Sequence, residues 1–252
     1  WRTALVLLGL AGLPLMAAVA ALREPERRLA EVEGERPEAA SALSQLRLHG
    51  ARLAPLILGC GLMSVGDFAL FSWAPAILAR NYAMAPAEIG GLLGAILVAT
   101  GVAGTLSAGF LSDRLTVQRG PRARLGLVIA TTVIALPGSL VWLTGAPFQL
   151  LALLSIWSLF STMTAVGGVM AIQEVVPNTL RGLSISLIAC ANIMLGLGLG
   201  TTLAGFLADK VFNDPLSLAH ALTLCVTPAA ALALACFAVA FTGMRTRSSG
   251  AG

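Results

Sequence analysis

Charged side chains are scarce in this sequence. Asp, Glu, Lys and Arg make up 11% of the 252 residues, whereas 57% of the residues are hydrophobic. An average soluble domain has about 25% charged residues. A chain with so few charged groups cannot keep its apolar side chains away from water, so the sequence predicts an all-α membrane protein whose main solvent is the lipid bilayer.

Residues that commonly perform catalysis or hold metals are also few. The chain has two histidines and a single lysine, Lys210, and its four cysteines lie in apolar runs without a CxxC spacing. The patterns GxSxG and HExxH, paired intramembrane acids and a phosphate-binding GxxxxGKS/T loop are all missing from the sequence. We therefore expect no enzymatic activity, no metal and no cofactor.

Seven apolar runs are long enough to cross a bilayer, since one helical span needs roughly 20 mainly apolar residues. A charged residue well inside such a run occurs once, at Asp67 in the second run. An acid near the centre of a bilayer costs about 3 kcal/mol, so Asp67 is a functional candidate. The seven runs cover residues 3–22, 53–79, 89–111, 125–143, 148–172, 183–207 and 221–243.

The basic residues gather at one side of the predicted helices. If successive runs alternate in direction, 13 of the 16 Lys and Arg residues fall on the same side of the membrane. This excess predicts that the side is cytoplasmic, together with the segment 23–52 and the C-terminal tail 244–252. The net charge of +4 is thus a topology signal, and we expect a multi-pass protein of the inner or plasma membrane with no nucleic-acid partner.

An eleven-residue segment occurs twice in the chain. GTLSAGFLSDR at 104–114 and GTTLAGFLADK at 200–210 share seven identical positions, and both end in a basic residue. The first copy ends a run that points toward the predicted cytoplasm, and the second ends a run that points away from it. Homologous segments of opposite orientation are typical of inverted repeats, so runs two to four and five to seven are predicted to form a 3+3 repeat. Convergent chemistry at helix ends is the alternative.

The chain resembles the major facilitator superfamily of transporters. The opening WRTALVLLGLAGLPLMAAVAALREPER is similar to the sixth helix and following loop of that family. GFLSDR, followed by Arg119 and Arg122, is similar to the loop after the family's eighth helix, with LTVQRGPR in place of the tighter Gly-Arg-Arg form. Residues 172–222 are closest to the spinster-like branch.

This resemblance implies a domain organisation. Residues 1–22 would be the last helix of an N-terminal six-helix half, and 23–52 the cytoplasmic central loop. Residues 53–243 would be a complete C-terminal six-helix half, followed by the cytoplasmic tail 244–252. The expected partners are the N-terminal half of the same protein and the lipid bilayer.

The resemblance also implies a function. It indicates a secondary active transporter that works by alternating access on an amphiphilic or lipid-like molecule or an organic anion, with protons as a candidate coupling ion. Broad-specificity efflux of drugs or metabolites is the alternative among transporters. A seven-helix receptor is the alternative from another class. A retinal photoreceptor would need a lysine within a span, and another receptor would leave the repeat unexplained.

Six residues within the runs are candidates for a substrate and ion cavity. The acid couples protons or binds a cationic substrate group, or else forms a hydrogen bond to a polar neighbour. The asparagine lines the cavity or ties two helices together. The aromatic residues contact substrate or pack, and the serines and threonines of 158–164 line the cavity wall or bond their own backbone. The candidates are Asp67, Phe71, Trp73, Trp157, Ser161 and Asn192.

A second set of candidates lies at the predicted cytoplasmic ends of the runs. Gly109 would let a neighbouring helix come close, and Asp113 would meet a helix N-terminus or an arginine. Glu174 is predicted to accept a hydrogen bond from Arg114 or Arg124. Such contacts would hold one face shut and break when it opens, whereas solvated surface charge is the alternative. The full set is Gly109, Asp113, Arg114, Glu174 and Arg181.

Overall fold

The regular structure of the protein is helical throughout the part of the chain that the structure describes. This structure is a computed structural model, and it describes residues 2–21, 39–120, 122–177, 180–212 and 217–243. Most of the predicted central loop and the whole predicted tail 244–252 lie outside those residues. The helices are α1 (Arg2–Ala20), α2 (Ala39–Tyr82), α3 (Pro86–Arg119), α4 (Arg122–Ala135), α5 (Pro147–Val175), α6 (Arg181–Ala191), α7 (Thr201–Phe206) and α8 (Leu218–Gly243).

Short, differently wound segments complete two of these helices. Two 3-10 turns, η2 (Leu136–Ser139) and η3 (Val141–Leu143), continue α4, because Pro137 cannot supply the amide hydrogen that an α-helix needs. The π-helical segment η5 (Asn192–Gly200) links α6 to α7, and a second one, η6 (Leu207–Phe212), continues α7, so that residues 181–212 form one continuous helix.

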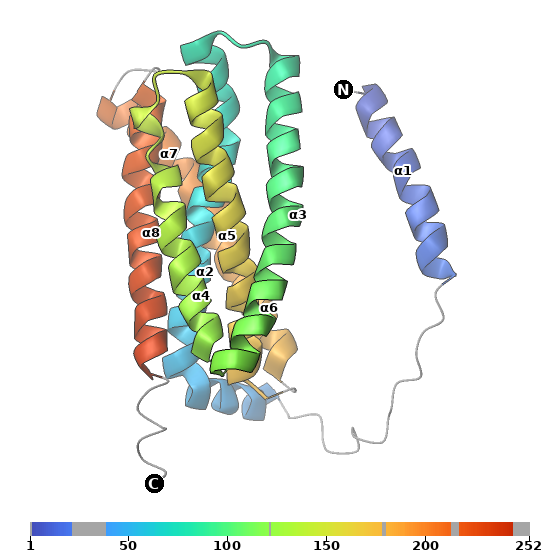
Figure 1. Ribbon diagram of the computed structural model, residues 1–252, viewed down its shortest axis with the longest axis vertical. Coiled ribbons are helices and arrows are strands. Elements are labelled where there is room, and N and C mark those ends of the chain that lie inside the picture. The colour runs from blue at the N-terminus through green and yellow to red at the C-terminus, as the bar shows by residue number, and fades with distance from the viewer. Residues whose placement is uncertain (1, 22–38, 121, 178–179, 213–216, 244–252) are drawn as a thin grey trace. The chain divides into compact units, whose positions relative to one another are not determined.

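Among the described residues, six helices are long and apolar enough to cross a membrane, and they coincide with the second to seventh predicted runs. The first run forms α1, whose apolar part is the shorter stretch Leu5–Ala20, so a seventh span stays a prediction. The chain divides into two compact units at residue 40, and α1 belongs to the first. The six long helices form the second unit, the bundle (Figure 1).

Helix α2 is the most buried element of the bundle. Of its best membrane-spanning window, 61% is buried, against 22% for α3 and 17% for the helix Arg181–Phe212. Helix α5 packs against both α3 and α4, and α8 packs against α4. The core lies between α2, α5 and α8, where the fully buried Leu70, Trp157 and Phe237 belong to one hydrophobic cluster.

Two glycines explain how η5 comes close to α2. A Cβ atom at Gly196 would lie 2.5 Å from the ring of Phe68, and one at Gly200 would lie 2.8 Å from the carbonyl oxygen of Val65. Only glycine fits such a contact between helix backbones. The glycines of α3 behave differently: Gly104 alone is close to another helix, at 2.9 Å from the carbonyl oxygen of Leu159.

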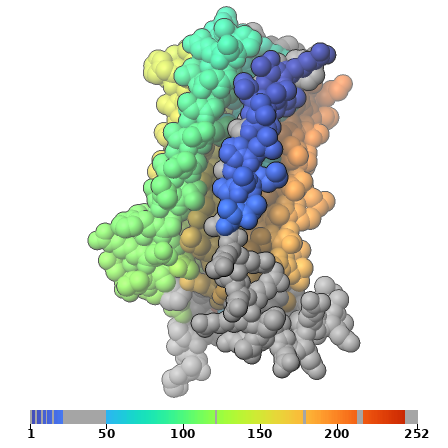
Figure 2. Space-filling model, turned by 90° about the vertical axis from the view of Figure 1, so that its right-hand side faces the viewer, coloured from blue at the N-terminus to red at the C-terminus, as the bar shows by residue number. Residues whose placement is uncertain are grey.

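The outer face of the bundle presents apolar stripes. On α3, Val98, Val102, Leu106 and Phe110 recur every four residues, and each is more than half exposed. Ile193, Met194 and Leu197 are equally exposed on η5. Figure 2 views one face of the bundle, with α3 in green on one side and Arg181–Phe212 in orange on the other. These side chains require an apolar neighbour, either lipid or protein.

Candidate functional site

A cavity of about 490 Å³ lies between α2, α3 and α5. Its polar atoms come from Asp67 and from hydroxyl groups, and no lysine or arginine is among its lining residues. Its apolar surface comes from two phenylalanines and several aliphatic side chains, so it suits a molecule with both an apolar body and a polar group. The lining residues are Asp67, Phe68, Phe71, Ser72, Leu97, Ser158, Ser161, Thr162, Ala165 and Val166.

Asp67 is held by neutral donors. The indole N–H of Trp157 donates to Oδ1 of Asp67 at 2.8 Å, which joins α2 to α5. Ser161, one helical turn beyond Trp157, lies against the same carboxyl group. The half-buried acid therefore has hydrogen-bond partners, and no cationic side chain pairs with it among the described residues.

Gly66 makes room for the indole that holds Asp67. A Cβ atom at Gly66 would lie 2.0 Å from Cζ2 of Trp157, which is far inside van der Waals contact. On the other side, a Cβ atom at Gly138 would lie 2.7 Å from the backbone nitrogen of Trp157. Trp157 has no exposed surface. Two glycines from different helices thus form the slot in which this tryptophan lies.

Hydroxyl groups link the helices around the cavity. Thr100 Oγ1 on α3 and Ser158 Oγ on α5 are 2.7 Å apart. Deeper in the bundle, Thr131 Oγ1 on α4 lies 2.8 Å from Thr164 Oγ1 on α5. Thr164 also donates to the carbonyl oxygen of Phe160 at 2.9 Å. Ser161 lines the cavity and donates to the carbonyl oxygen of Ser158 at 3.3 Å.

The structure brings three of the six predicted cavity residues together and places the other three elsewhere. Asp67, Phe71 and Ser161 line the cavity. Trp157 does not line the cavity, but its indole N–H donates a hydrogen bond to Asp67. Trp73 points away from the cavity and donates from Nε1 to the carbonyl oxygen of Thr201 at 3.1 Å, which ties α2 to α7.

Asn192 lies at a helix crossing. Its backbone carbonyl oxygen accepts from Ser64 Oγ at 3.2 Å, so the tie between helices uses the main chain. Its side-chain Oδ1 is buried without a hydrogen-bond partner among the described residues. Asn192 is not among the residues that line the cavity.

Two further lining residues, Ser158 and Thr162, lie in the segment 158–164 whose hydroxyl groups were predicted to line the cavity or bond their own backbone. The others were missed because they are small or apolar. Phe68 and Ser72 lie one and five positions after Asp67, and Ala165 follows Ser158 at helical spacing. Placing Asp67 on a helical wheel would have found Phe68, Phe71 and Ser72 on one face. The remaining α5 residues carry no such signal, because their spacing is equally typical of packing.

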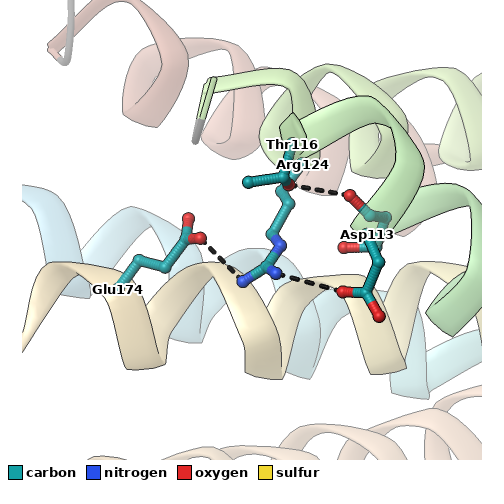
Figure 3. A network of polar contacts seen from close by, with 5 residues as sticks. Asp113, Thr116, Arg124 and Glu174 are labelled. Atoms are coloured by element: carbon teal, nitrogen blue, oxygen red, sulfur yellow. Dashed lines mark hydrogen bonds and ion pairs between the residues drawn. The ribbon is translucent and has the colours of Figure 1, made fainter. Parts of the chain in front are cut away.

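A second polar cluster joins the ends of three helices, and we call it the end cluster: Asp113 on α3, Arg124 on α4 and Glu174 on α5. Arg124 donates from one terminal nitrogen to Glu174 Oε1 at 2.6 Å and from the other to Asp113 Oδ1 at 3.3 Å (Figure 3). The Glu174 side chain is 28% exposed and that of Asp113 is 73% exposed. The bond to Glu174 is therefore the stronger of the two.

The local fold explains why these ends meet. Helix α3 ends at Gly120, whose φ of +81° favours glycine, and its amide donates to the carbonyl oxygen of Thr116 at 2.9 Å. Thr116 Oγ1 in turn donates to the carbonyl oxygen of Ser112 at 2.7 Å (Figure 3). The chain then reverses, and α4 starts at Arg122, two residues before the arginine of the cluster.

Of the two arginines predicted for Glu174, the structure selects Arg124. Arg114 is exposed and forms no described contact with Glu174. Arg181 begins α6, is also exposed, and forms no ion pair within the described ranges. At Gly109, no described atom outside its own helix lies within 4 Å of a Cβ, so the close approach of a neighbouring helix at this position stays a prediction.

Comparisons with known proteins agree on one family. A family model described as Major Facilitator Superfamily matches residues 1–201. A protein named MFS-type efflux pump, from Mycolicibacterium smegmatis (strain ATCC 700084 / mc(2)155), is 27% identical over 215 residues, which cover 85% of this chain and 49% of the relative. The chain thus spans about half the length of that relative. No solved structure matches the chain.

Proposed function

Since the chain belongs to the major facilitator superfamily, a family of membrane transporters, we propose that it forms part of a secondary active transporter that works by alternating access. Its substrate would be an amphiphilic molecule, and the direction would be efflux. The observation on which this proposal depends is a half-buried carboxyl group at the wall of an amphiphilic cavity, with no counter-ion in the part of the chain that the structure describes.

The cavity favours some substrates over others. Phenylalanines and aliphatic side chains offer contact to an apolar body, and the hydroxyl groups offer hydrogen bonds. An organic anion would lie beside Asp67 with no cationic group in the lining to offset the repulsion. A neutral or cationic amphiphile is therefore the better candidate. This agrees with the efflux function in the relative's name. The similarity of residues 172–222 to the spinster-like branch, which suggests lipid-like substrates, is compatible with the same cavity.

Asp67 would couple transport to protons. An ionised carboxylate in a cavity of low polarity is costly, so the acid would take up a proton when the cavity faces one side and release it when the cavity faces the other. A cationic substrate group and a proton would then compete for the same oxygen atoms. That competition would link substrate movement to the proton gradient.

The chain would supply one of two six-helix halves. Residues 53–243 would be the C-terminal half with its 3+3 inverted repeat, and residues 1–22 the last helix of the N-terminal half. Two observations support this arrangement. The apolar stripe on α3 requires an apolar neighbour. The first copy of the repeated segment ends at the lower end of the bundle, whereas α7, in the second copy, lies toward the upper end (Figure 1).

The test of the coupling proposal is Asp67→Asn in the full-length protein, reconstituted into proteoliposomes. Gradient-driven transport of a fluorescent cationic amphiphile is expected to fall at least a hundredfold, because the amide accepts no proton and carries no charge. Exchange without a gradient, for a neutral amphiphile, is expected to continue. Unchanged transport and unchanged pH dependence in the variant would reject a coupling role for Asp67.

The test of the inverted repeat is labelling from one side of the membrane. Thr116→Cys and Phe212→Cys lie just beyond the two copies of the repeated segment. In sealed cells, a membrane-impermeant maleimide is expected to label Phe212→Cys and to reach Thr116→Cys only after permeabilisation. The parent chain, with its native cysteines, provides the background. Labelling of both positions from the same side would remove the repeat proposal and leave the Asp67 proposal untouched.

A further inference from the structure

A second cavity, of about 380 Å³, lies at the junction of α3, α4 and α8 and shares no lining residue with the Asp67 site. The start of α4 lies beside the end of α3 and beside α8 (Figure 1). We call this cavity the α4 groove. It is lined by Leu115, Arg119, Arg122, Ala123, Gly126, Leu127, Ala130 and Phe241.

The α4 groove has a charged end and an apolar end. Arg122 is the first residue of the membrane-spanning helix Arg122–Leu143, so Arg119 and Arg122 lie where that span begins. Gly126 and Ala130 follow on the same helix face, roughly 6 and 12 Å further along the axis. Beyond the arginines the lining residues are all apolar. A ligand that fills the groove must therefore be charged at one end and apolar at the other.

The glycine of the groove has a clear effect on its shape. A Cβ atom built at Gly126 meets no atom within 4 Å, so the position opens onto empty space. Ala123 and Ala130 leave the same helix face without long side chains, and Phe241 of α8 and Leu115 of α3 complete the lining. The groove is thus open because the residues on this helix face are small, and a long side chain at position 126 would fill it without displacing the core.

We propose that the α4 groove binds an anionic phospholipid from the leaflet at this end of the bundle. The two guanidinium groups would bind the headgroup phosphate, for which arginine is well suited, and an acyl chain would lie over Gly126 and Ala130. Charge complementarity favours an anionic lipid over a zwitterionic one, because the described lining of the groove contains two arginines and no carboxylate.

The experiment uses the purified full-length protein in detergent and counts bound lipids by native mass spectrometry. Phosphatidylglycerol and phosphatidylcholine with identical acyl chains are titrated in parallel. The parent protein is expected to retain at least one phosphatidylglycerol that phosphatidylcholine does not replace. Arg119→Ala is expected to weaken the binding of that lipid about fivefold, and the double variant Arg119→Ala/Arg122→Ala about twenty-five-fold. Arg80→Ala, at an exposed site on α2, is the control and should leave the bound lipid unchanged.

A second variant tests the apolar end without altering charge. Gly126→Leu fills the groove and is expected to displace the same lipid, with both arginines in place. Gly90→Leu is the matched control, since a Cβ at Gly90 also meets nothing within 4 Å and that residue does not line the groove.

Three results would overturn the proposal. Equal retention of both lipids by the parent would mean ordinary lipid solvation of the helices. Unchanged binding in Gly126→Leu and in the double arginine variant would place the lipid elsewhere. Displacement of the lipid by soluble glycerol phosphate at millimolar concentration would mean a site for a free phosphate group. None of these results bears on the Asp67 proposal.

Discussion

Asp67 on α2 and Glu174 on α5 are both acids that accept a hydrogen bond from a neighbouring helix, but their partners differ in kind. Asp67 meets the neutral indole of Trp157 inside the bundle, whereas Glu174 meets the charged guanidinium of Arg124 at a helix end. A neutral donor offsets the desolvation of a carboxylate only in part, while a cation offsets most of it. In the proposed function, Asp67 would therefore gain and lose a proton, whereas the ion pair of Glu174 and Arg124 would hold two helix ends together.

The bundle would thus combine an acid that takes part in transport, Asp67, with an ion pair that stabilises helix ends, Glu174 with Arg124. Neutralising Asp67 removes a buried charge and leaves no orphaned cation, so the change should affect transport more than stability. Neutralising Glu174 leaves Arg124 with a single, mostly solvated partner, so the change should affect the packing of helix ends more than the cavity. Each prediction below tests one side of this contrast.

The largest effect is expected for Gly66→Ala. The new methyl group would lie 2.0 Å from the Trp157 ring, so the fully buried indole must move and its bond to Asp67 must break. We expect a loss of about 3 kcal/mol in stability, and no measurable gradient-driven transport. The measurement is thermal unfolding of the full-length protein in detergent, followed by transport in proteoliposomes.

Gly91→Ala is the matched control for that change. No atom lies within 4 Å of a Cβ at Gly91, and alanine favours a helix by about 1 kcal/mol over glycine. The control is therefore expected to unfold at the same or a slightly higher temperature. Similar losses in both variants would mean that the slot around Trp157 is not what makes Gly66 necessary.

The next effect concerns the donor alone. Trp157→Phe keeps an aromatic ring in the slot and removes the N–H that binds Asp67 at 2.8 Å. We expect transport to fall about tenfold, equivalent to the loss of one hydrogen bond to a charged group, roughly 1.5 kcal/mol. The pH dependence of transport should shift as well, because an acid with fewer donors is harder to ionise.

Trp73→Phe separates positioning from general packing. Trp73 also donates one hydrogen bond across helices, to the carbonyl oxygen of Thr201 at 3.1 Å, and it does not line the cavity. Trp73→Phe should lower the unfolding temperature about as much as Trp157→Phe does, because each change removes one hydrogen bond between helices. It should leave the pH profile of transport unchanged. If the two variants shift that profile equally, Trp157 has no specific role in positioning Asp67.

Much of the bundle could be predicted from the sequence, because hydropathy alone determines where helices cross a bilayer. All six long helices coincide with apolar runs, and the predicted contact of Glu174 with an arginine is present. The ends of the helices were predicted less accurately: α3 extends to Arg119, whereas its apolar run ends at residue 111. Amphipathic end turns are not apolar, so hydropathy cannot locate them.

The cavity could be predicted only in part. An acid inside an apolar run is unusual enough to identify Asp67 from composition. Trp73 and Trp157 have no such distinguishing feature, because both lie in apolar runs and their roles depend on the rotation of each helix. The glycines show the same limit: Gly196 and Gly200 contact α2, whereas a Cβ at Gly109 meets no described atom outside its own helix within 4 Å. Spacing indicates that two helices are able to approach, without specifying which ones do so.

A double-mutant cycle would sharpen the contrast at the end cluster. Arg124→Ala and Glu174→Gln, alone and combined, are expected to give a coupling free energy of about 1 kcal/mol, since the pair is 2.6 Å apart and partly buried. The same cycle with Asp113→Asn should give about 0.3 kcal/mol, because that side chain is 73% exposed. The measurement is chemical or thermal unfolding of all variants under identical detergent conditions. Equal couplings would mean that Arg124 is shared evenly between the two acids.

The smallest effect compares the two copies of the repeated segment. Asp113 in the first copy contacts Arg124, while the equivalent Asp209 in the second copy is exposed and has no ion pair within the described ranges. Asp113→Asn is therefore expected to lower stability by about 0.3 kcal/mol, a loss that disappears in 1 M salt. Asp209→Asn should change stability by less than that at any salt concentration. A larger and salt-sensitive loss at Asp209 would reverse this order, and it would mean that the two copies share a contact as well as a sequence.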